Sequence, residues 1–286
     1  MESLLRSNVA HLFIAAFFLL SAGCRIPTSW MGGGSRQPNI VLMMADDLGW
    51  ADLGIQGHPF LRTPNIDAVA ENGLRFTRFY SAAPVCSPTR GSVLTGRHPF
   101  RYGVFSANTH HLPEEEITLA EVLRDNGYRT GFFGKWHLGT LTVSERDGMR
   151  GGITSHTHFQ PPARHGFHVS FATEAKVPTY DPMLMPEGQT RMVWWNPVGE
   201  SHQTPESYGS AYWNTDDQKV VDNLGGDDSR VMMDRAIPFI KSAAQSNTPF
   251  LAVIWFHAPH LPLVSDSTSR AAYADMSPRA QLNCPA

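Results

Sequence analysis

The stretch PNIVLMMADDLG, residues 38–49, decides how the rest of the chain is interpreted. Residues 40–45 form a continuous apolar run, which is typical of a strand buried on both faces and therefore of a parallel sheet flanked by helices. Asp46 and Asp47 follow directly at the carboxyl end of this run. In open α/β sheets that edge is where ligands bind. The stretch therefore predicts both a sheet and a ligand site at its edge.

Helical and strand patterns alternate after this stretch. The segment 63–73 predicts a helix with Thr63 as its N-cap and Ile66, Val69 and Ala70 as its apolar face. The remaining predictions are a strand over 74–81, a helix over 119–126, a strand over 128–133, long loops over 140–227, a helix over 229–245 and a strand over 249–256. This alternation predicts an α/β fold with a mostly parallel central sheet and helices on both faces.

A short helix is predicted within AAPVCSPTRGSVLTG, residues 82–96. Ser87 is the expected N-cap, Pro88 the first helical residue and Gly96 the terminator. Cys86 then lies at the positive end of the helix dipole, with Arg90 one turn inside. The whole chain has only three cysteines, so no disulfide scaffold is implied and Cys86 has no evident structural role.

Composition limits the classes of function. The chain has 286 residues, of which 42% are hydrophobic, and a formal net charge of −3. This is long enough for one large domain with its own core. No lysine or arginine run exists to neutralise phosphates, which argues against a nucleic-acid binder. An anionic substrate would have to be held by local positive charge.

The N-terminus resembles an export signal. Arg6 precedes a short apolar run over 12–20, and small residues lead to Cys24. Residues 1–24 are therefore predicted to be a signal peptide, and a Gly/Ser-rich tether is predicted over 25–37. Simple secretion, a lipid anchor at Cys24 and a buried N-terminal helix remain open for this segment. The first two place the protein outside the cytoplasm. It would then be periplasmic, extracellular, or anchored to the membrane as a lipoprotein.

Polar side chains follow four predicted elements that end at one edge of the sheet. Adjacent carboxylates repel each other unless a divalent cation lies between them, and carboxylate oxygens suit calcium or magnesium. Arginine, lysine and histidine side chains together could bind a tetrahedral dianion. Each group alone has a simpler explanation: the aspartates as a solvated turn, the lysine as a surface residue and a histidine as a core residue. The prediction of a binding site therefore depends on their joint occurrence. The residues are Asp46, Asp47, Cys86, Arg90, Lys135, His137, His257 and His260.

The same residues lie in motifs that resemble the formylglycine-dependent sulfatases. CSPTR at 86–90 matches the Cys-x-Pro-x-Arg signature of that family. Residues 39–54, GKWHLG at 134–139 and HAPHLP at 257–262 are similar to further family blocks in the same order. The resemblance covers about residues 38–275, is closest to the arylsulfatase A and N-acetylgalactosamine-6-sulfatase type, and implies an alkaline-phosphatase-like fold.

The resemblance implies that a maturation enzyme oxidises Cys86 to formylglycine. The hydrated aldehyde would then attack the sulfur of a sulfate ester, and loss of its second hydroxyl proton would expel sulfate. Asp46, Asp47 and the modified residue 86 would bind one calcium ion.

The resemblance also implies roles for the basic side chains. Arg90 would stabilise the modified residue, and Lys135 would bind sulfate. His137 would take the proton of the diol, and His260 would orient sulfate and help protonate the leaving alcohol. His257, which is nearer the strand, is expected to support the site from behind.

Part of the family pattern is missing from the sequence. A further Asp-Asn-Gly block for the calcium site and a later lysine are expected after residue 275, where residues 276–286 instead form an atypical tail. Residues 38–275 are thus expected to be an incomplete N-terminal catalytic domain. Asp125-Asn126-Gly127 and Asp222-Asn223 do not follow buried strands, so neither pair is expected to bind the ion.

The sequence therefore predicts hydrolysis of an aryl sulfate or a sulfated carbohydrate. Two alternatives remain: a phosphonate or phosphodiester hydrolase of the same superfamily, and an inactive fragment that only binds sulfated glycans. The expected partners are a sulfated substrate and the maturation enzyme. Trp194, Trp195 and Trp213 could line a sugar subsite, and packing in loops or core is the alternative.

Overall fold

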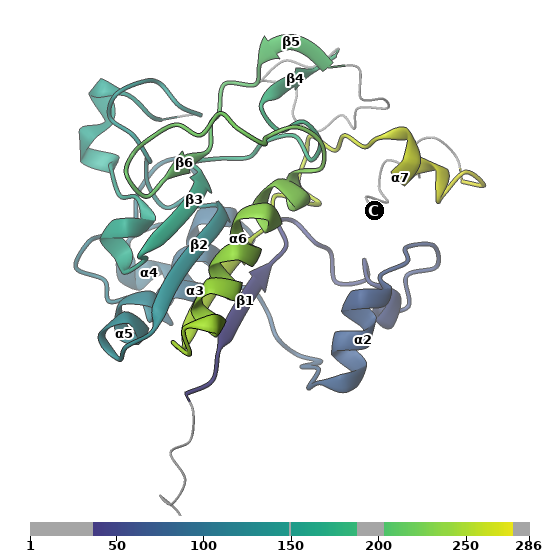
Figure 1. Cartoon of the computed structure of the whole chain (residues 1–286), viewed down its shortest axis with the longest axis horizontal. Helices are drawn as coiled ribbons and strands as arrows, with labels where there is room; N and C mark the ends of the chain where they lie inside the picture. Colours follow the sequence, from purple (N-terminus) through teal and green to yellow (C-terminus); the bar gives the residue numbers. More distant parts are fainter. Residues whose placement is uncertain (1–36, 149, 188–202, 277–286) are drawn as a thin grey trace, which may run out of the picture. The chain divides into compact units, whose positions relative to one another are not determined.

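The computed structural model describes residues 37–148, 150–187 and 203–276 (Figure 1). The described residues from Asn39 onward belong to one compact unit. The strands are β1 (Ile40–Met44), β2 (Arg129–Lys135), β3 (Val169–Thr173), β4 (Leu184–Pro186), β5 (Gln203–Ser207), β6 (Trp213–Asn214) and β7 (Phe250–Trp255). The helices are α2 (Pro64–Asn72), α3 (Cys86–Thr95), α4 (Pro99–Tyr102), α5 (Leu119–Asp125), α6 (Asp228–Gln245) and α7 (Ser267–Ala271), with 3₁₀ turns η2 (Gly54–Gln56), η3 (Ile153–His158) and η4 (Pro162–His165).

The central sheet has five strands in the order β1-β7-β2-β3-β6. β1, β7, β2 and β3 are parallel, and only β6 pairs in the antiparallel sense. Met44 lies opposite Trp255, and Lys135 lies opposite Thr173, so the carboxyl ends of these strands meet at one edge. The predicted mostly parallel α/β sheet is confirmed.

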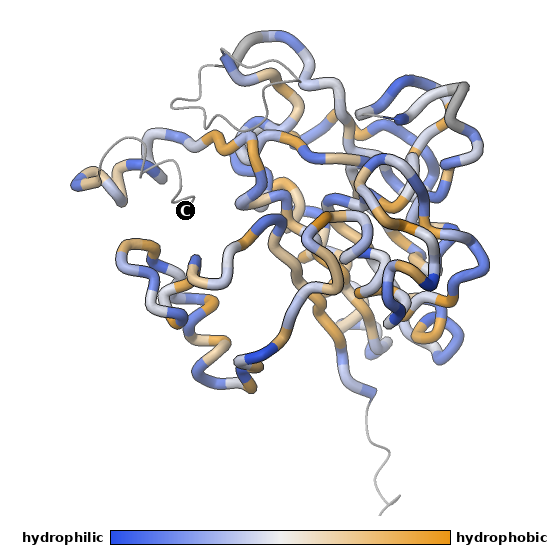
Figure 2. Tube along the Cα trace, turned by 180° about the vertical axis from the view of Figure 1, so that it is seen from behind, coloured by the Kyte–Doolittle hydropathy of each residue, from blue (hydrophilic) through white to orange (hydrophobic). Residues whose placement is uncertain are grey.

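Helices cover both faces of this sheet. On one face, residues of α3, α4 and α5 share a core with Phe132 and Leu251. On the other face, α6 packs its apolar side chains against Phe133 and Ile254 (Figure 1). Figure 2 shows that the hydrophobic colouring runs along the central strands. The predicted capping box at the start of α5 is present.

Strand β1 was predicted to be buried on both faces, and this prediction is wrong. Val41 and Met43 are 46% and 59% exposed, while the alternate residues are half-buried. Among the described residues β1 pairs with β7 alone, and its outer face carries no covering helix. An apolar run therefore indicated a strand without indicating its position at the sheet edge.

The region after β1 also differs from expectation. Residues 74–81 form no strand, and Leu74 and Phe79 are more than 80% exposed. The helix α2 is present, but Ile66 and Val69 on its apolar face are exposed. The described part of the chain supplies no sheet edge or packing surface for these side chains. They therefore stay exposed, although their sequence pattern predicts that they are buried.

The expected loop region contains a central strand that the sequence did not reveal. β3 lies between β2 and β6 and is almost entirely buried. A segment of five residues is too short to show a clear hydrophobic pattern. Its strand conformation is determined by hydrogen-bonded pairing with the neighbouring strands.

Within the described ranges, the structure contains no helix that is both long and apolar enough to cross a membrane. The predicted signal peptide with Cys24, nearly all of the tether, Trp194, Trp195 and the tail from 277 lie outside the described residues.

Candidate active site

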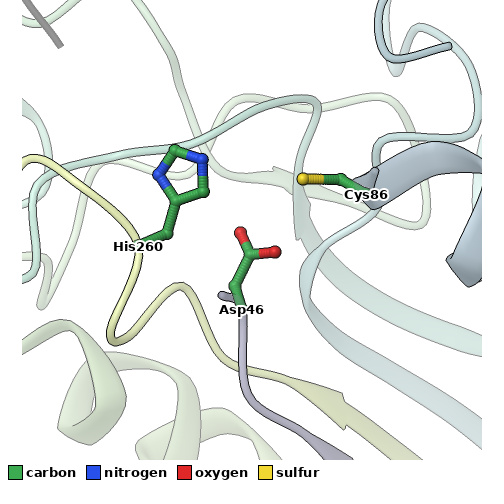
Figure 3. A group of neighbouring side chains, drawn as sticks. All are labelled: Asp46, Cys86 and His260. Atoms are coloured by element: carbon green, nitrogen blue, oxygen red, sulfur yellow. The ribbon is translucent and has the colours of Figure 1, made fainter. Parts of the chain in front are cut away.

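The carboxylate of Asp46 lies at the centre of the candidate site, where β1 ends (Figure 3). Its Oδ2 lies 2.5 Å from Lys135 Nζ, and its Oδ1 accepts a hydrogen bond of 2.8 Å from Arg90. All three side chains are buried. Burial would raise the pKa of Asp46, but the charges of Arg90 and Lys135 outweigh it and hold the pKa well below its usual value. Asp46 is therefore ionised, with two buried cations as partners.

Cys86 is the first residue of α3 and faces Lys135. Its Sγ lies 3.5 Å from Lys135 Nζ, and burial raises the pKa of the thiol against the opposing lysine charge. Val85 rather than Ser87 is the N-cap, which corrects the prediction. The Ser87 hydroxyl is engaged elsewhere, because it donates a 2.6 Å hydrogen bond to the buried carbonyl of His137.

Two glycines in the motifs permit close approaches around these residues. A Cβ on Gly91 would lie 2.7 Å from the Tyr102 ring, whose hydroxyl donates to the carbonyl of Pro88. Gly134, which precedes Lys135, has φ +107°, and its Cβ would lie 2.0 Å from the Trp255 carbonyl oxygen. Glycine at these positions lets α3 and the end of β2 pack tightly beside the site.

Arg90 is held inside the protein. It donates to the Lys135 carbonyl and to Asp46, and its guanidinium lies 5.1 Å from the centre of the Trp255 ring. With 2% exposure it supports Asp46 and the end of β2 instead of reaching into solvent. These contacts fit a stabilising role better than direct capture of an anion.

His137 lies two residues beyond the end of β2 and has a left-handed backbone conformation. Its φ is +56°, and its N–H donates to the carbonyl of Glu174 beyond β3. Burial, and then the charges of Lys135 and Arg90, hold the pKa of His137 well below its usual value. Asp47 also has a left-handed backbone, with φ +64°. Such conformations in residues other than glycine gather at functional sites.

His260 comes from the loop after β7 and faces the Asp46 carboxylate from the side opposite Cys86 (Figure 3). Its Nδ1 donates to the Leu261 carbonyl, and its Nε2 lies 3.5 Å from Asp47 Oδ2. Burial and the Lys135 charge lower the pKa of His260 to about 4. The sequence motifs thus converge at one edge of the sheet.

His257 lies behind the site, as the sequence suggested. It is fully buried, with Nδ1 2.7 Å from Asp228 Oδ2 and Nε2 2.7 Å from the Thr173 hydroxyl. Tyr212 donates to the other oxygen of Asp228. This network fixes the loop that carries His260 against β3 and α6.

The donor atoms fit calcium in part. Asp46, Cys86 and His260 offer ligand atoms within 4.8 Å of one another, and Asp47 adds an exposed carboxylate beside His260. Carboxylate oxygens suit calcium, whereas a thiol and an imidazole do not. Conversion of Cys86 to formylglycine would replace its sulfur with oxygen. Among the described residues, Asp46 and Asp47 are therefore the side chains whose carboxylate oxygens would suit such an ion.

A cavity of about 290 Å³ opens beside these groups. Its lining includes Asp46, Asp47, Cys86 and Arg90 together with Ser81 and residues 83–85. A small tetrahedral anion fits this volume, since a water molecule occupies about 30 Å³ of liquid.

Two residues near the site escaped the sequence analysis. Asn108 accepts a hydrogen bond from His137 Nε2 at 2.8 Å, and nothing in its local pattern marks it. Lys176 is half-buried three residues beyond β3, and burial followed by the Lys135 charge lowers its pKa to about 8. Prediction of β3 would have identified Lys176 as a polar residue at the carboxyl end of a strand.

Other candidates lie apart from the site. Arg235 binds the Asp222 carboxylate, and Asn223 contacts Arg230 and Asp234 on α6. Asp125 and Asn126 end helix α5. Trp213 is 2% exposed and donates its indole N–H to Asp147, so it belongs to the core and not to a sugar subsite.

The fold and site together define an α/β protein with a buried cluster of one carboxylate and two cations at the carboxyl edge of a parallel sheet. The family model described as Sulfatase matches residues 38–285. The chain belongs to the sulfatase family.

Curated relatives agree with this assignment. Human arylsulfatase A is 53% identical over 110 residues, which cover 37% of this chain and 22% of that protein. N-acetylgalactosamine-6-sulfatase of Canis lupus familiaris is 31% identical over 264 residues, which cover 85% of this chain and 44% of that protein. The chain thus spans less than half the length of these relatives.

Solved structures share the fold. Ps i-CgsB superposes with a TM-score of 0.68 at 24% identity, covering 86% of this chain and 51% of the other. The phosphonate monoester hydrolase of Agrobacterium radiobacter gives a TM-score of 0.51 at 23% identity, covering 82% of this chain and 44% of the other.

Proposed function

We propose that the protein hydrolyses sulfate esters through a formylglycine derived from Cys86, with one calcium ion. The observation that carries the proposal is the position of Cys86 Sγ, 3.5 Å from Lys135 Nζ, beside a carboxylate that is held by Lys135 and Arg90. A nucleophile formed at residue 86 would thus have a cation within reach of the sulfate it attacks.

The side chains divide the remaining work. Lys135 binds a sulfate oxygen, and His260 orients the sulfate. Its Nδ1–H stays on the Leu261 carbonyl, so the ring helps protonate the leaving alcohol only in its imidazolium form, which carries a second proton on Nε2. His137 takes a proton from the hydroxyl of residue 86. The aldehyde supplies, once hydrated, the attacking hydroxyl and the second hydroxyl whose deprotonation releases sulfate. Asp46, Asp47 and the oxygen at residue 86 would hold calcium, which supplies positive charge to the developing oxyanions.

The substrate is proposed to be an aryl sulfate or a sulfated carbohydrate. The relative with the widest coverage reported above is named for a sulfated amino sugar, which supports a sugar substrate. The chain is further proposed to be exported, with a lipid on Cys24 as one form of anchoring. An accompanying maturation enzyme must read Cys86-Ser87-Pro88-Thr89-Arg90 before the chain folds, since Ser87 and Arg90 are buried in the folded protein.

A phosphonate or phosphodiester hydrolase is the second candidate. The cations around Asp46 would attract any tetrahedral anion, and the Agrobacterium radiobacter neighbour shares the fold. Aryl sulfate and aryl phosphodiester substrates, assayed side by side with the matured protein and calcium, distinguish the two. Faster turnover of the sulfate supports the proposal, and faster turnover of the diester contradicts it. Binding of sulfated glycans without turnover would instead support an inactive fragment that only binds such glycans.

A further inference from the structure

The ring of His137 presents an unusual pair of nitrogens. Its Nε2 bonds to Asn108 Oδ1 at 2.8 Å. Its Nδ1 is buried and has no hydrogen-bond partner among the described residues. A buried nitrogen without a partner costs free energy unless a group that the structure does not contain satisfies it. Among the described residues, Nδ1 is therefore the ring nitrogen that no protein group occupies.

We propose that Asn108 is a positioning residue, which holds the proton of His137 on Nε2 and so leaves Nδ1 as the atom that accepts the proton from residue 86. An amide oxygen can only accept a hydrogen bond, so Nε2 must be the donor. A neutral imidazole has one N–H, and Nδ1 then carries the lone pair. The inference rests on the proposed formylglycine chemistry and adds to it the tautomer of its base.

The neutral state of the ring follows from its surroundings. His137 is 4% exposed, and Lys135, Arg90 and Arg150 bring positive charge near it, while Asp46 brings negative charge. Burial and the excess of cations both disfavour an imidazolium. In the proton transfer, the O–H bond at residue 86 breaks and an N–H bond forms at Nδ1. The ring becomes a cation whose Nε2–H remains bonded to Asn108.

The backbone of Asn108 suits this role. Its φ is +60°, a left-handed conformation that asparagine tolerates better than most residues. The half-buried side chain can therefore reach the ring from a loop without the strain that a branched residue would carry there.

A buried ion pair fixes the loop of Asn108 to the strand end of His137. Arg150 donates to the carbonyl of His110 at 2.5 Å and to Glu174 Oε1 at 2.8 Å. The carbonyl of Glu174 in turn accepts the backbone N–H of His137. Glu174 is fully buried, and the Arg150 side chain is 9% exposed. The contacts from Asn108 through His137, Glu174 and Arg150 return to His110, so both ends of the Nε2 bond are anchored.

The first experiment uses the unmodified full chain labelled with ¹⁵N-histidine. The His137 signals are assigned by their loss in His137→Gln. We expect a protonated Nε2 and an unprotonated Nδ1 near neutral pH. Asn108→Gly, which keeps the left-handed backbone, should give a mixture of tautomers, and Asn108→Asp, which keeps the acceptor, should not. Asn247→Gly is the matched control, since Asn247 has φ +53° in the turn before β7, at the other end of the sheet. A proton on Nδ1 in the parent protein, or unchanged tautomers in Asn108→Gly, would overturn the proposal.

The second experiment measures turnover of an aryl sulfate by the matured protein with calcium. Asn108→Gly should lower kcat on the order of a hundredfold, because general-base catalysis contributes about that much, with little change in KM. Asn108→Asp should recover most of the loss, and Asn247→Gly should match the parent. A loop-docking role alone would leave kcat unchanged and refute the inference. Absence of turnover in the parent would contradict the proposed function instead, and the ¹⁵N signals would still decide the role of Asn108.

Discussion

Replacement of Asp46 by asparagine tests the electrostatic core of the site. The change keeps the shape of the side chain and removes its charge. Lys135 and Arg90, which are 1% and 2% exposed, then remain buried without their shared counter-ion. The amide nitrogen of asparagine would also face one of these two donors, since both oxygens of Asp46 accept hydrogen bonds.

The magnitude follows from burial. Removal of one partner from a buried ion pair costs about 3–5 kcal/mol, mostly because the remaining charge stays uncompensated. Asp47 supplies the matched control, because its carboxylate is 63% exposed and its nearest partner is His260 Nε2 at 3.5 Å. Asp47→Asn should change stability by less than about 1 kcal/mol.

Urea unfolding of the unmodified chain, with a chelator present, measures both values. A lower midpoint at an unchanged m-value reports the loss of stability. The double substitution Asp46→Leu with Lys135→Met should recover part of that loss, because it removes a buried charge together with its partner. Equal effects of Asp46→Asn and Asp47→Asn would refute the reasoning.

Three further predictions concern a titrating core residue, the substrate and the metal. Burial and the Glu174 carboxylate raise the pKa of Asp147 to about 7, above the unfolded value of about 3.9. Its stabilising contribution is therefore complete below about pH 4 and is lost as the pH rises through about 7, a slope that urea unfolding should show in the parent and not in Asp147→Asn. Lys176→Met should raise KM for a sulfate ester roughly tenfold or more, as expected for loss of a charge-assisted contact, and an unchanged KM would place Lys176 outside the substrate site. Chelation of calcium, or Asp47→Ala, should lower kcat of the matured enzyme by on the order of a hundredfold or more, whereas full activity after both would show that no ion is needed.

The sequence predicted the α/β fold class and which side chains gather at the carboxyl edge of the sheet, while their roles in catalysis stay predictions. Lys135 ends β2, Cys86 begins α3 and His260 lies in the loop after β7, and the parallel strands bring their carboxyl ends to one edge. Asn108 could not be found in this way, because its contact with His137 is created by a loop. Its anchor, the Arg150–Glu174 pair, is equally invisible in local patterns.

The wrong fold predictions share one cause. The apolar run 40–45 and the aromatic-rich segment 74–81 indicate residues that favour burial, and they do not indicate which surface covers these residues. Within the described part of the chain, β1 lies at the sheet edge with one exposed face, and residues 74–81 form no strand. β3 shows the opposite case, in which pairing with β2 gives five residues a conformation that their own pattern does not favour.

Mass spectrometry of the tryptic peptide 79–90, after co-expression of the full chain with a formylglycine-generating enzyme, tests the central claim most directly. Arg78 and Arg90 define the peptide, and Cys86 is its one cysteine. We expect an aldehyde at residue 86 that reacts with a hydrazide, reduced in Pro88→Ala and absent in Cys86→Ala. An unmodified thiol at residue 86, under conditions in which the enzyme converts a control peptide, would contradict the account.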